Sequence, residues 1–284
     1  MEVSIIIPTF NEEKVISDCL ESILDQDYKD FEVIVVDDGS SDKTLEIISN
    51  FEIENPMLKI FKQKHLGAGM ARNLGAKFAK GEILVFVDAD MVFDKKFVKN
   101  LIKPILDKKT IGTFSKDEFV LNKDNLWSKC WNINKNLPKN KMHPRDYPNE
   151  QAVFRAILKK EFQRVGGFNL IGYIDDHTLS EKLNVKAQLA EGAIFYHRNP
   201  ESLKEVFIQA RWIGKSEYKS RKIENENLMR LISIVRYSLL FSLINGITKA
   251  VKLKIPEFVF FKIIYDFAVE ISLFKSFFSG DLYK

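Results

Sequence analysis

Residues 81–90 read GEILVFVDAD, an apolar segment that ends in two carboxylates. The apolar run at 83–87 predicts a strand buried on both faces of a parallel sheet, with Asp88 and Asp90 at its carboxyl end. Ligands of open α/β sheets bind at this edge, and two neighbouring carboxylates repel each other unless a cation lies between them. The stretch therefore indicates a divalent metal that serves a phosphate-bearing substrate. An Asp-rich turn after a strand would show the same pattern.

The segments around this stretch alternate between strand and helix patterns. Such alternation is typical of βαβ units, so we predict an α/β fold with a mostly parallel sheet flanked by helices. The sequence predicts strands at residues 3–8, 31–36, 58–61, 82–87, 111–114 and 188–196, of which the first is a continuous apolar run. Apolar residues at helical spacing predict helices at residues 15–24, 41–51, 67–78, 94–106 and 201–221.

Three later segments depart from this alternation. Residues 122–149 are polar and show no clear period, which is typical of a lid or binding loop. Residues 228–251 and 257–278 are apolar helical stretches separated by a proline. The second stretch predicts an amphipathic helix with a wide apolar side, because its charged residues recur every four positions and share one face: Lys262, Asp266 and Glu270.

Charge and cysteine content indicate where the protein works. Of the net charge of +4, the excess lies from residue 201 onward, where Lys and Arg outnumber Asp and Glu by 14 to 9. Basic and apolar residues together favour a membrane surface over nucleic acid as the partner. Two cysteines give no disulfide framework, and no cleavable signal peptide is recognisable. We therefore expect a cytoplasmic protein, peripheral on the inner face of the cell membrane.

The C-terminal helices leave three arrangements open. They can lie in the membrane interface, pack as a hairpin on protein, or span the bilayer. A span needs about 20 mostly apolar residues, and the longest uncharged run, at residues 237–248, is only about a dozen long. We expect the interfacial arrangement.

Four strand ends carry distinctive residues: PTFNE (8–12), DDGSSD (37–42), HLGAGMARN (65–73) and DAD (88–90). With VGGF (165–168), the acidic pair at 175–176 and AIFYH (193–197), they resemble glycosyltransferase family 2, the inverting nucleotide-sugar enzymes of the GT-A fold, over residues 3–214. The resemblance implies a GT-A catalytic domain at 1–222. Its nucleotide-sugar half would be about 1–115 and its acceptor half about 116–222, followed by a helical, membrane-associating appendage at 223–284.

The resemblance implies a site for a UDP- or GDP-linked sugar. A divalent metal, Mn²⁺ or Mg²⁺, would stabilise the leaving diphosphate, with Asp90 as a direct ligand, Asp88 as a ribose or water-mediated partner and His197 as a third ligand. For His197, a satisfied core histidine is the alternative. Asp38 would accept a hydrogen bond from the nucleobase or ribose. The implied nucleotide-sugar residues are Pro8, Thr9, Glu12, Asp38, Arg72, Asp88 and Ala89. For Arg72, a solvated helix face is the alternative.

The acceptor hydroxyl needs a general base. Asp176 is our candidate, and the neighbouring Asp175 would raise its pKa by repulsion. Either acid could instead cap the helix predicted at 177–183. The sequence QARW (209–212) resembles the QxxRW motif of processive family members but is one residue short. Weaker candidates for diphosphate or acceptor binding are Arg211, Trp212 and Lys215.

The predicted function is metal-dependent sugar transfer, with inversion and a single displacement, to a hydroxyl of a glycan or a lipid-linked saccharide. One alternative is a polyprenyl-phosphate sugar synthase, which the sequence MVFD at 91–94 disfavours because it lacks the proline-bearing run of such synthases. Another is a non-catalytic sugar-nucleotide-binding scaffold, which the intact Asp88, Asp90 and Asp176 disfavour. The GxG at 67–69 does not predict a dinucleotide site, because the third glycine position holds Arg72.

Overall fold

The chain folds into two compact units. The computed structural model describes residues 2–169, 177–214 and 226–278. The first unit comprises Met1–Leu121 and Lys141–His197, and the second comprises Asn122–Asn140 and Arg198–Lys284. These bounds follow the packing of the chain. The expected boundary at residue 222 separates a catalytic domain from an appendage by function, and it stays a prediction.

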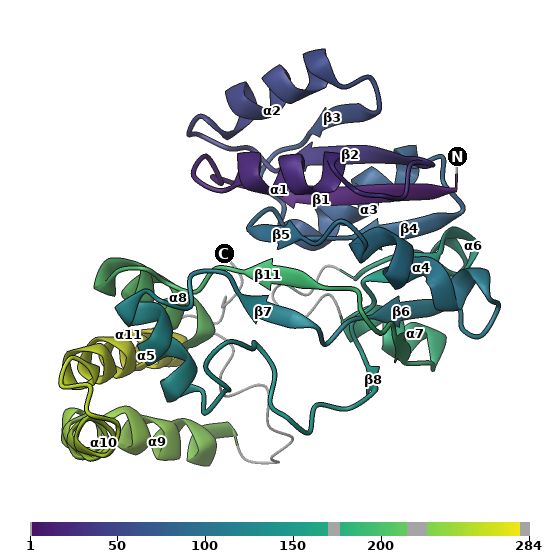
Figure 1. The fold of residues 1–284 in the computed structure, drawn as a ribbon. Helices are drawn as coiled ribbons and strands as arrows, with labels where there is room; N and C mark the ends of the chain where they lie inside the picture. The colour runs from purple at the N-terminus through teal and green to yellow at the C-terminus, as the bar shows by residue number, and fades with distance from the viewer. Residues whose placement is uncertain (1, 170–176, 215–225, 279–284) are drawn as a thin grey trace. The chain divides into compact units, whose positions relative to one another are not determined.

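The first unit contains two sheets (Figure 1). The larger has the strand order β3-β2-β1-β4-β9-β6-β10-β8, and its first four strands are parallel. The smaller has the order β5-β11-β7. The strands are β1 (Val3–Thr9), β2 (Phe31–Asp37), β3 (Leu58–Lys62), β4 (Ile83–Phe86), β5 (Met91–Phe93), β6 (Gly112–Phe114), β7 (Glu118–Val120), β8 (Glu150–Gln151), β9 (Ala156–Leu158), β10 (Ala187–Leu189) and β11 (Phe195–His197).

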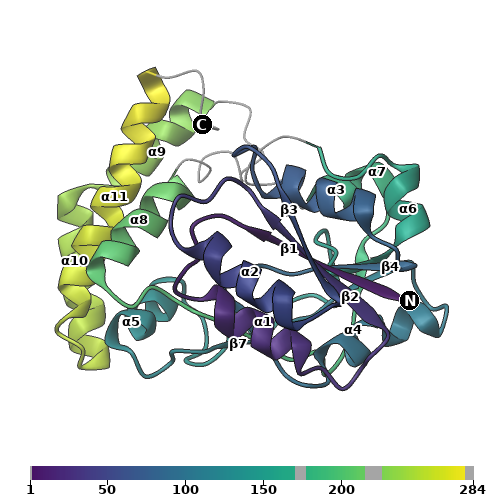
Figure 2. The ribbon, with the colours of Figure 1, turned by 90° about the horizontal axis from the view of Figure 1, so that it is seen from above.

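Helices cover both faces of the larger sheet, as Figure 2 shows for α1 and α2 on one face and α3 on the other. The parallel strands therefore have no water-facing side, which explains their continuous apolar sequence. The helices of the first unit are α1 (Ile16–Leu24), α2 (Thr44–Glu54), α3 (Ala68–Phe78), α4 (Phe97–Leu106), α6 (Lys159–Arg164) and α7 (Thr178–Leu183).

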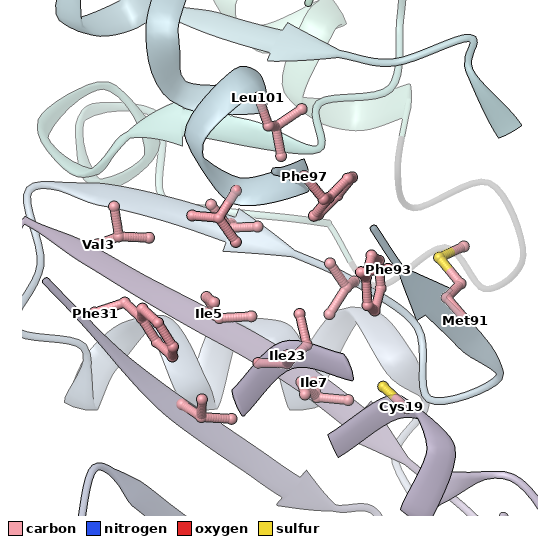
Figure 3. Packing of buried hydrophobic residues seen from close by; sticks show 14 of the residues in the cluster. Val3, Ile5, Ile7, Cys19, Ile23, Phe31, Met91, Phe93, Phe97 and Leu101 are labelled. Atoms are coloured by element: carbon pink, nitrogen blue, oxygen red, sulfur yellow. The ribbon is translucent and has the colours of Figure 1, made fainter. Parts of the chain in front are cut away.

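Successive residues of the central strands contribute to two separate cores. On β1, Val3, Ile5 and Ile7 pack with α1, α2 and α4, whereas Ile6 packs with α3 and α6. Figure 3 shows part of the first core, in which Phe97 of α4 lies beside Phe93. This alternation is the two-residue period of a strand. It fixes the register of β1 and therefore the place where its carboxyl end lies.

Gly81 lets β4 begin directly beside β1. A Cβ atom on Gly81 would lie 2.5 Å from the Val3 carbonyl carbon and 2.6 Å from the Ser4 nitrogen. Because backbone cannot yield as a side chain can, we expect Gly81→Ala to lower the free energy of unfolding by about 1–3 kcal/mol. Denaturant unfolding monitored by circular dichroism measures this change. The exposed neighbour Lys80 provides the control Lys80→Ala, and equal stability of the two variants would contradict the predicted clash.

The second unit is helical. Its helices are α5 (Leu126–Asn134), α8 (Leu203–Gly214), α9 (Glu226–Tyr237), α10 (Leu239–Leu253) and α11 (Phe258–Phe278). Helix α11 packs on both α8 and α10 and also contacts α5 (Figure 2). Trp131 of α5 lies edge-on to Tyr265 of α11, with 5.5 Å between the ring centroids. The unit thus has an apolar core of its own, to which α5 contributes Cys130 and Trp131.

Several expectations about these later elements are wrong. The single late strand predicted at 188–196 is two strands, β10 and β11, which belong to different sheets. The segment 122–149 contains helix α5, because its two tryptophans and Cys130 pack against the C-terminal helices. The stretch 228–251 is two helices that meet at Ser238, where the backbone is extended.

Two charged residues of α11, Lys262 and Asp266, point inward rather than toward water. Asp266 is fully buried and accepts hydrogen bonds from Lys262 Nζ and from Ser242 Oγ of α10, both at 2.7 Å. The two opposite charges neutralise each other, so the pair can be buried where a lone charge could not. Burial raises the pKa of Asp266, and Lys262 counteracts this effect. No helix within the described residues is long and apolar enough to cross a bilayer.

Candidate functional site

The carboxyl ends of β1, β2 and β4 meet at one edge of the larger sheet. Because these strands are parallel and in register, with Thr9 paired to Asp37, the residues that follow them are brought together. The predicted residues Thr9, Asp38 and Asp88 all lie at this edge. The structure thus brings these three residues to one edge, and their roles in binding stay predictions.

Asp38 holds the loop between β3 and α3. Its buried carboxylate accepts hydrogen bonds from the backbone nitrogens of Leu66 and Gly67, at 2.8 and 2.9 Å, and from Gln63 Nε2 at 2.6 Å. His65 Nδ1 lies 2.9 Å from the same carboxylate. Asp38 thus shapes the loop, and a direct bond to a nucleobase would require one of these partners to move. Its role in base binding stays a prediction.

Thr9 carries a buried hydroxyl group beside this loop. Its Oγ1 has no hydrogen-bond partner among the described residues, although the side chain is almost completely buried. The Thr9 carbonyl oxygen accepts a hydrogen bond from the Asp38 nitrogen at 2.8 Å. Next to it, the rings of Phe10 and His65 are stacked, with 3.9 Å between their centroids. A buried hydroxyl without a partner is costly, so Thr9 is suited to donate to a ligand at this edge.

Asp88 is clamped by two arginines. Arg72 Nη2 of α3 lies 2.6 Å from Asp88 Oδ1, and Arg155 Nη1, just before β9, lies 3.0 Å from Oδ2. Burial acts to raise the pKa of Asp88, but Arg155 and then Arg72 outweigh it and hold that pKa well below its ordinary value. Arg72 is buried, so the alternative of a solvated helix face is wrong.

Asp90 begins a chain of four polar side chains. Its Oδ2 lies 2.8 Å from His197 Nε2 at the end of β11, and His197 Nδ1 lies 2.8 Å from Glu118 Oε1 on β7. The second oxygen of Glu118 lies 2.9 Å from His143 Nε2. Burial acts to lower the pKa of His197, but the carboxylates of Asp90 and Glu118 outweigh it and raise that pKa well above its ordinary value.

Glu12 shares the electrostatic environment of this acidic cluster. Burial, followed by the carboxylates of Asp90, Asp88 and Asp42, raises the pKa of Glu12 to about 8. Glu12 is therefore mostly protonated at neutral pH in the absence of a cation. A cluster of acids that holds a proton in this way has surplus negative charge, which a bound cation would balance.

The residues around Asp90 fit a divalent cation that also binds the substrate. Asp90 is about one-third exposed and offers oxygen, and His197 Nε2 offers nitrogen. Glu118 behind His197 supplies the carboxylate that orients a metal-binding histidine. Each oxygen of Asp88 already accepts a bond from an arginine, and its part in a metal site stays a prediction. The described residues contain no group of three or more His, Cys, Asp or Glu side chains that could hold a metal by themselves. Phosphate oxygens would have to complete the site, as is usual for Mg²⁺.

Three residues of this site were missed by the sequence analysis: Glu118, His143 and Arg155. Glu118 and His197 are 79 positions apart, and no periodic pattern links them. His143 lies in the polar segment 122–149, where a binding loop was expected, and this was the only signal that could have pointed to it. Arg155 follows no recognisable motif.

Pro8 lies on β1, and Ala89 is buried just after β4. The other predicted residues fall into two groups. Asp175, Asp176 and Lys215 lie outside the described residues. Arg211 and Trp212 lie on α8 in the second unit, where Ser272 Oγ donates a 2.7 Å hydrogen bond to the Arg211 carbonyl oxygen and the Trp212 side chain is exposed. The catalytic roles proposed for Asp175 and Asp176, and the binding roles of the other three, stay predictions.

Known proteins share this sequence pattern and this fold. Glycosyltransferase GlyG of Streptococcus pneumoniae is 34% identical over 107 residues, which are 37% of this chain and 36% of GlyG. The mannosyltransferase PcManGT of Pyrobaculum calidifontis, solved with GDP-Man and Mn²⁺, has a TM-score of 0.61 and 19% identity over 97% of this chain and 87% of its own. Staphylococcus aureus TarS 1-349, solved with UDP, has a TM-score of 0.55 and 20% identity over 97% and 92%.

These matches differ in what they establish. At such low identity the two solved structures show the fold, which is of the GT-A type. The match to GlyG spans about a third of that protein's length. The profile of glycosyl transferase family 2 matches residues 4–166, more than half of the chain. The chain therefore belongs to glycosyl transferase family 2.

Proposed function

We propose that this protein moves a sugar from a UDP- or GDP-linked donor to a hydroxyl group of a glycan or a lipid-linked saccharide. The transfer would be a single displacement that inverts the anomeric carbon. One observation carries the proposal. At the carboxyl edge of the sheet, Asp88 with its two arginines lies next to the hydrogen-bonded series Asp90, His197, Glu118 and His143. This edge combines positive charge for a diphosphate with ligands for a cation.

The donor would be held along the edge from β2 to β4. The unpartnered Thr9 hydroxyl, with Pro8 and the loop held by Asp38, would contact the nucleoside. Arg72 and Arg155 would contact the diphosphate, because a guanidinium group binds phosphate oxygens in a bidentate manner. The GDP-Man and UDP bound by PcManGT and TarS are consistent with such a donor.

Asp90 and His197 would hold a divalent cation. When bound there, Mn²⁺ or Mg²⁺ would stabilise the negative charge that develops on the leaving diphosphate. Glu118 keeps the imidazole ring oriented, and His143 in turn fixes Glu118. Asp176, helped by Asp175, would take the proton from the acceptor hydroxyl as the new bond forms.

Calorimetry with a Glu118 variant tests this assignment. Wild-type protein is expected to bind UDP or GDP more tightly when Mn²⁺ is present. Glu118→Gln keeps the size of the side chain but removes its charge and replaces one of its two acceptor oxygens with an amide donor. The cation-dependent affinity should therefore fall about 10- to 100-fold. Wild-type protein that binds neither nucleotide in the presence or absence of Mn²⁺ would contradict the proposed function.

The matched control for that experiment is Glu150→Gln. Glu150 lies on the exposed strand β8 of the same unit and accepts one hydrogen bond from Gln188. Its replacement should leave nucleotide binding unchanged. If Glu118→Gln also binds like wild type, while both proteins melt at the same temperature, the role of Glu118 in orienting His197 is wrong.

A further inference from the structure

The outward side of α10 consists of large apolar side chains. Leu240, Ile244, Ile247 and Val251 recur every three or four residues and therefore lie on one side of the helix. Their exposed fractions are 66, 54, 52 and 74%. We call these four residues the α10 outer face. The side of a helix that contacts only water usually carries polar and charged residues. The α10 outer face is therefore suited to contact an apolar surface.

The inward side of α10 is small and polar. Ser242, Gly246 and Ala250 are buried, and Ser242 donates its hydrogen bond to Asp266 of α11. A Cβ atom on Gly246 would already lie 3.3 Å from the Val259 Cα atom. Because α11 packs so closely here, the large side chains of α10 have no room on this side. The packing of the helix pair therefore keeps the α10 outer face pointing away from α11.

An apolar groove adjoins this face. It has a volume of about 290 Å³ and is lined only by apolar residues: Ile247, Ala250, Val251, Pro256 and Val259. A groove of this composition gives water no hydrogen-bond partner on its side chains. It suits hydrocarbon, such as part of an acyl chain.

Positive charge surrounds the same face. Between Asn227 and Pro256 the chain has five Lys or Arg residues and no Asp or Glu. Among them, Arg236 precedes α10, whereas Lys252 and Lys254 lie at its other end, and all three are exposed. Exposed cations at both ends of an apolar stripe are typical of a helix that lies in the surface of an anionic membrane. They argue for lipid over a second copy of this chain, whose equivalent face would carry the same positive charge.

We propose that the α10 outer face docks on the surface of an anionic lipid bilayer. Its four side chains lie at the boundary between headgroups and acyl chains, and Arg236, Lys252 and Lys254 contact the headgroups. The proposal is independent of the sugar-transfer chemistry, because it involves only the second unit.

Vesicle binding by the full chain tests the apolar contribution. Wild-type protein is expected to sediment with phosphatidylcholine vesicles that contain phosphatidylglycerol, and added salt should weaken this binding. Ile244→Gln/Ile247→Gln should lower the binding constant at least about tenfold, because two apolar side chains no longer leave water. The matched control is Ile53→Gln on α2 of the first unit, an 82% exposed isoleucine that should not affect binding.

A second variant tests the charge contribution and remains informative if the isoleucine variant is unstable. Lys252→Gln/Lys254→Gln leaves the apolar residues in place and should weaken binding about fivefold for each lysine. Thermal melting followed by circular dichroism checks that both variants fold.

Four results would overturn the proposal. One is wild-type protein that does not sediment with anionic vesicles. Another is equal binding to pure phosphatidylcholine. A third is wild-type binding by both folded variants. The fourth is a lipid-free dimer, seen by sedimentation velocity, that Ile244→Gln/Ile247→Gln converts to monomer, because the face would then join two copies of the chain.

Discussion

Asp176→Asn is expected to slow sugar transfer by about 10²–10⁴-fold, the usual contribution of a positioned general base. A sugar hydroxyl must lose its proton during attack, and asparagine has the size of aspartate without its basicity. The loss should appear in kcat, because the proton moves in the transition state. Binding of the donor and of Mn²⁺ should stay near wild type. Steady-state transfer assays and calorimetry on the same preparation measure both quantities.

Two further variants sharpen this test. Asp175→Asn should have a milder effect, since it acts only through the pKa of its neighbour. Asp107→Asn, an exposed acid just after α4, should have none. If the Asp176 variant transfers sugar to a polyprenyl phosphate at the wild-type rate, the acceptor is already an anion, and the enzyme is a polyprenyl-phosphate sugar synthase.

Asp90→Asn is expected to lower the cation-dependent affinity for UDP or GDP more than about 100-fold, beyond the range of residues that only orient a metal ligand. The diphosphate would bind largely through the cation, and asparagine lacks the negative charge that binds the cation. Calorimetric titration of UDP and GDP, with Mn²⁺ and with a chelator, measures this difference. Binding in the presence of the chelator should be the same for both proteins.

The control for this variant is Asp25→Asn. Asp25 forms an exposed ion pair, 3.0 Å from Lys95, and its side chain is 64% exposed, so its charge should not affect the site. Unchanged manganese-dependent binding by Asp90→Asn would show that Asp90 is not a metal ligand.

The central sheet could be predicted from the sequence because its strands are buried on both faces. The apolar runs at 3–8, 31–36 and 82–87 correspond to β1, β2 and β4 within two residues at each end. Shorter strands such as β5, β7 and β9 have three residues each, too few to show a period. Their partners come from distant parts of the chain, so only tertiary structure defines them. The same limit led to the wrong single strand at 188–196.

Site residues that directly follow a strand could be predicted from the sequence. Contacts between side chains from distant parts of the chain could not. Asp88 and Asp90 follow a recognisable strand, and their position after β4 agrees with that prediction. The resemblance had placed His197 with Asp90. That Asp88 would also bind Arg155 depends on β9, which approaches from elsewhere in the chain. The inward charges of α11 were also hidden, because a helical wheel shows that Lys262 and Asp266 share a face but not that Ser242 lies against it.

The discontinuity of the second unit has a consequence for protein synthesis. Lys249 Nζ donates a hydrogen bond to the Ile133 carbonyl oxygen of α5 across 116 positions. At a translation rate of about 5–20 residues per second, about 6–23 s pass between the synthesis of Ile133 and the synthesis of Lys249. During this time Cys130 and Trp131 lack the C-terminal helices that bury them. Chaperones that bind nascent apolar segments therefore have a defined period in which α5 is accessible to them.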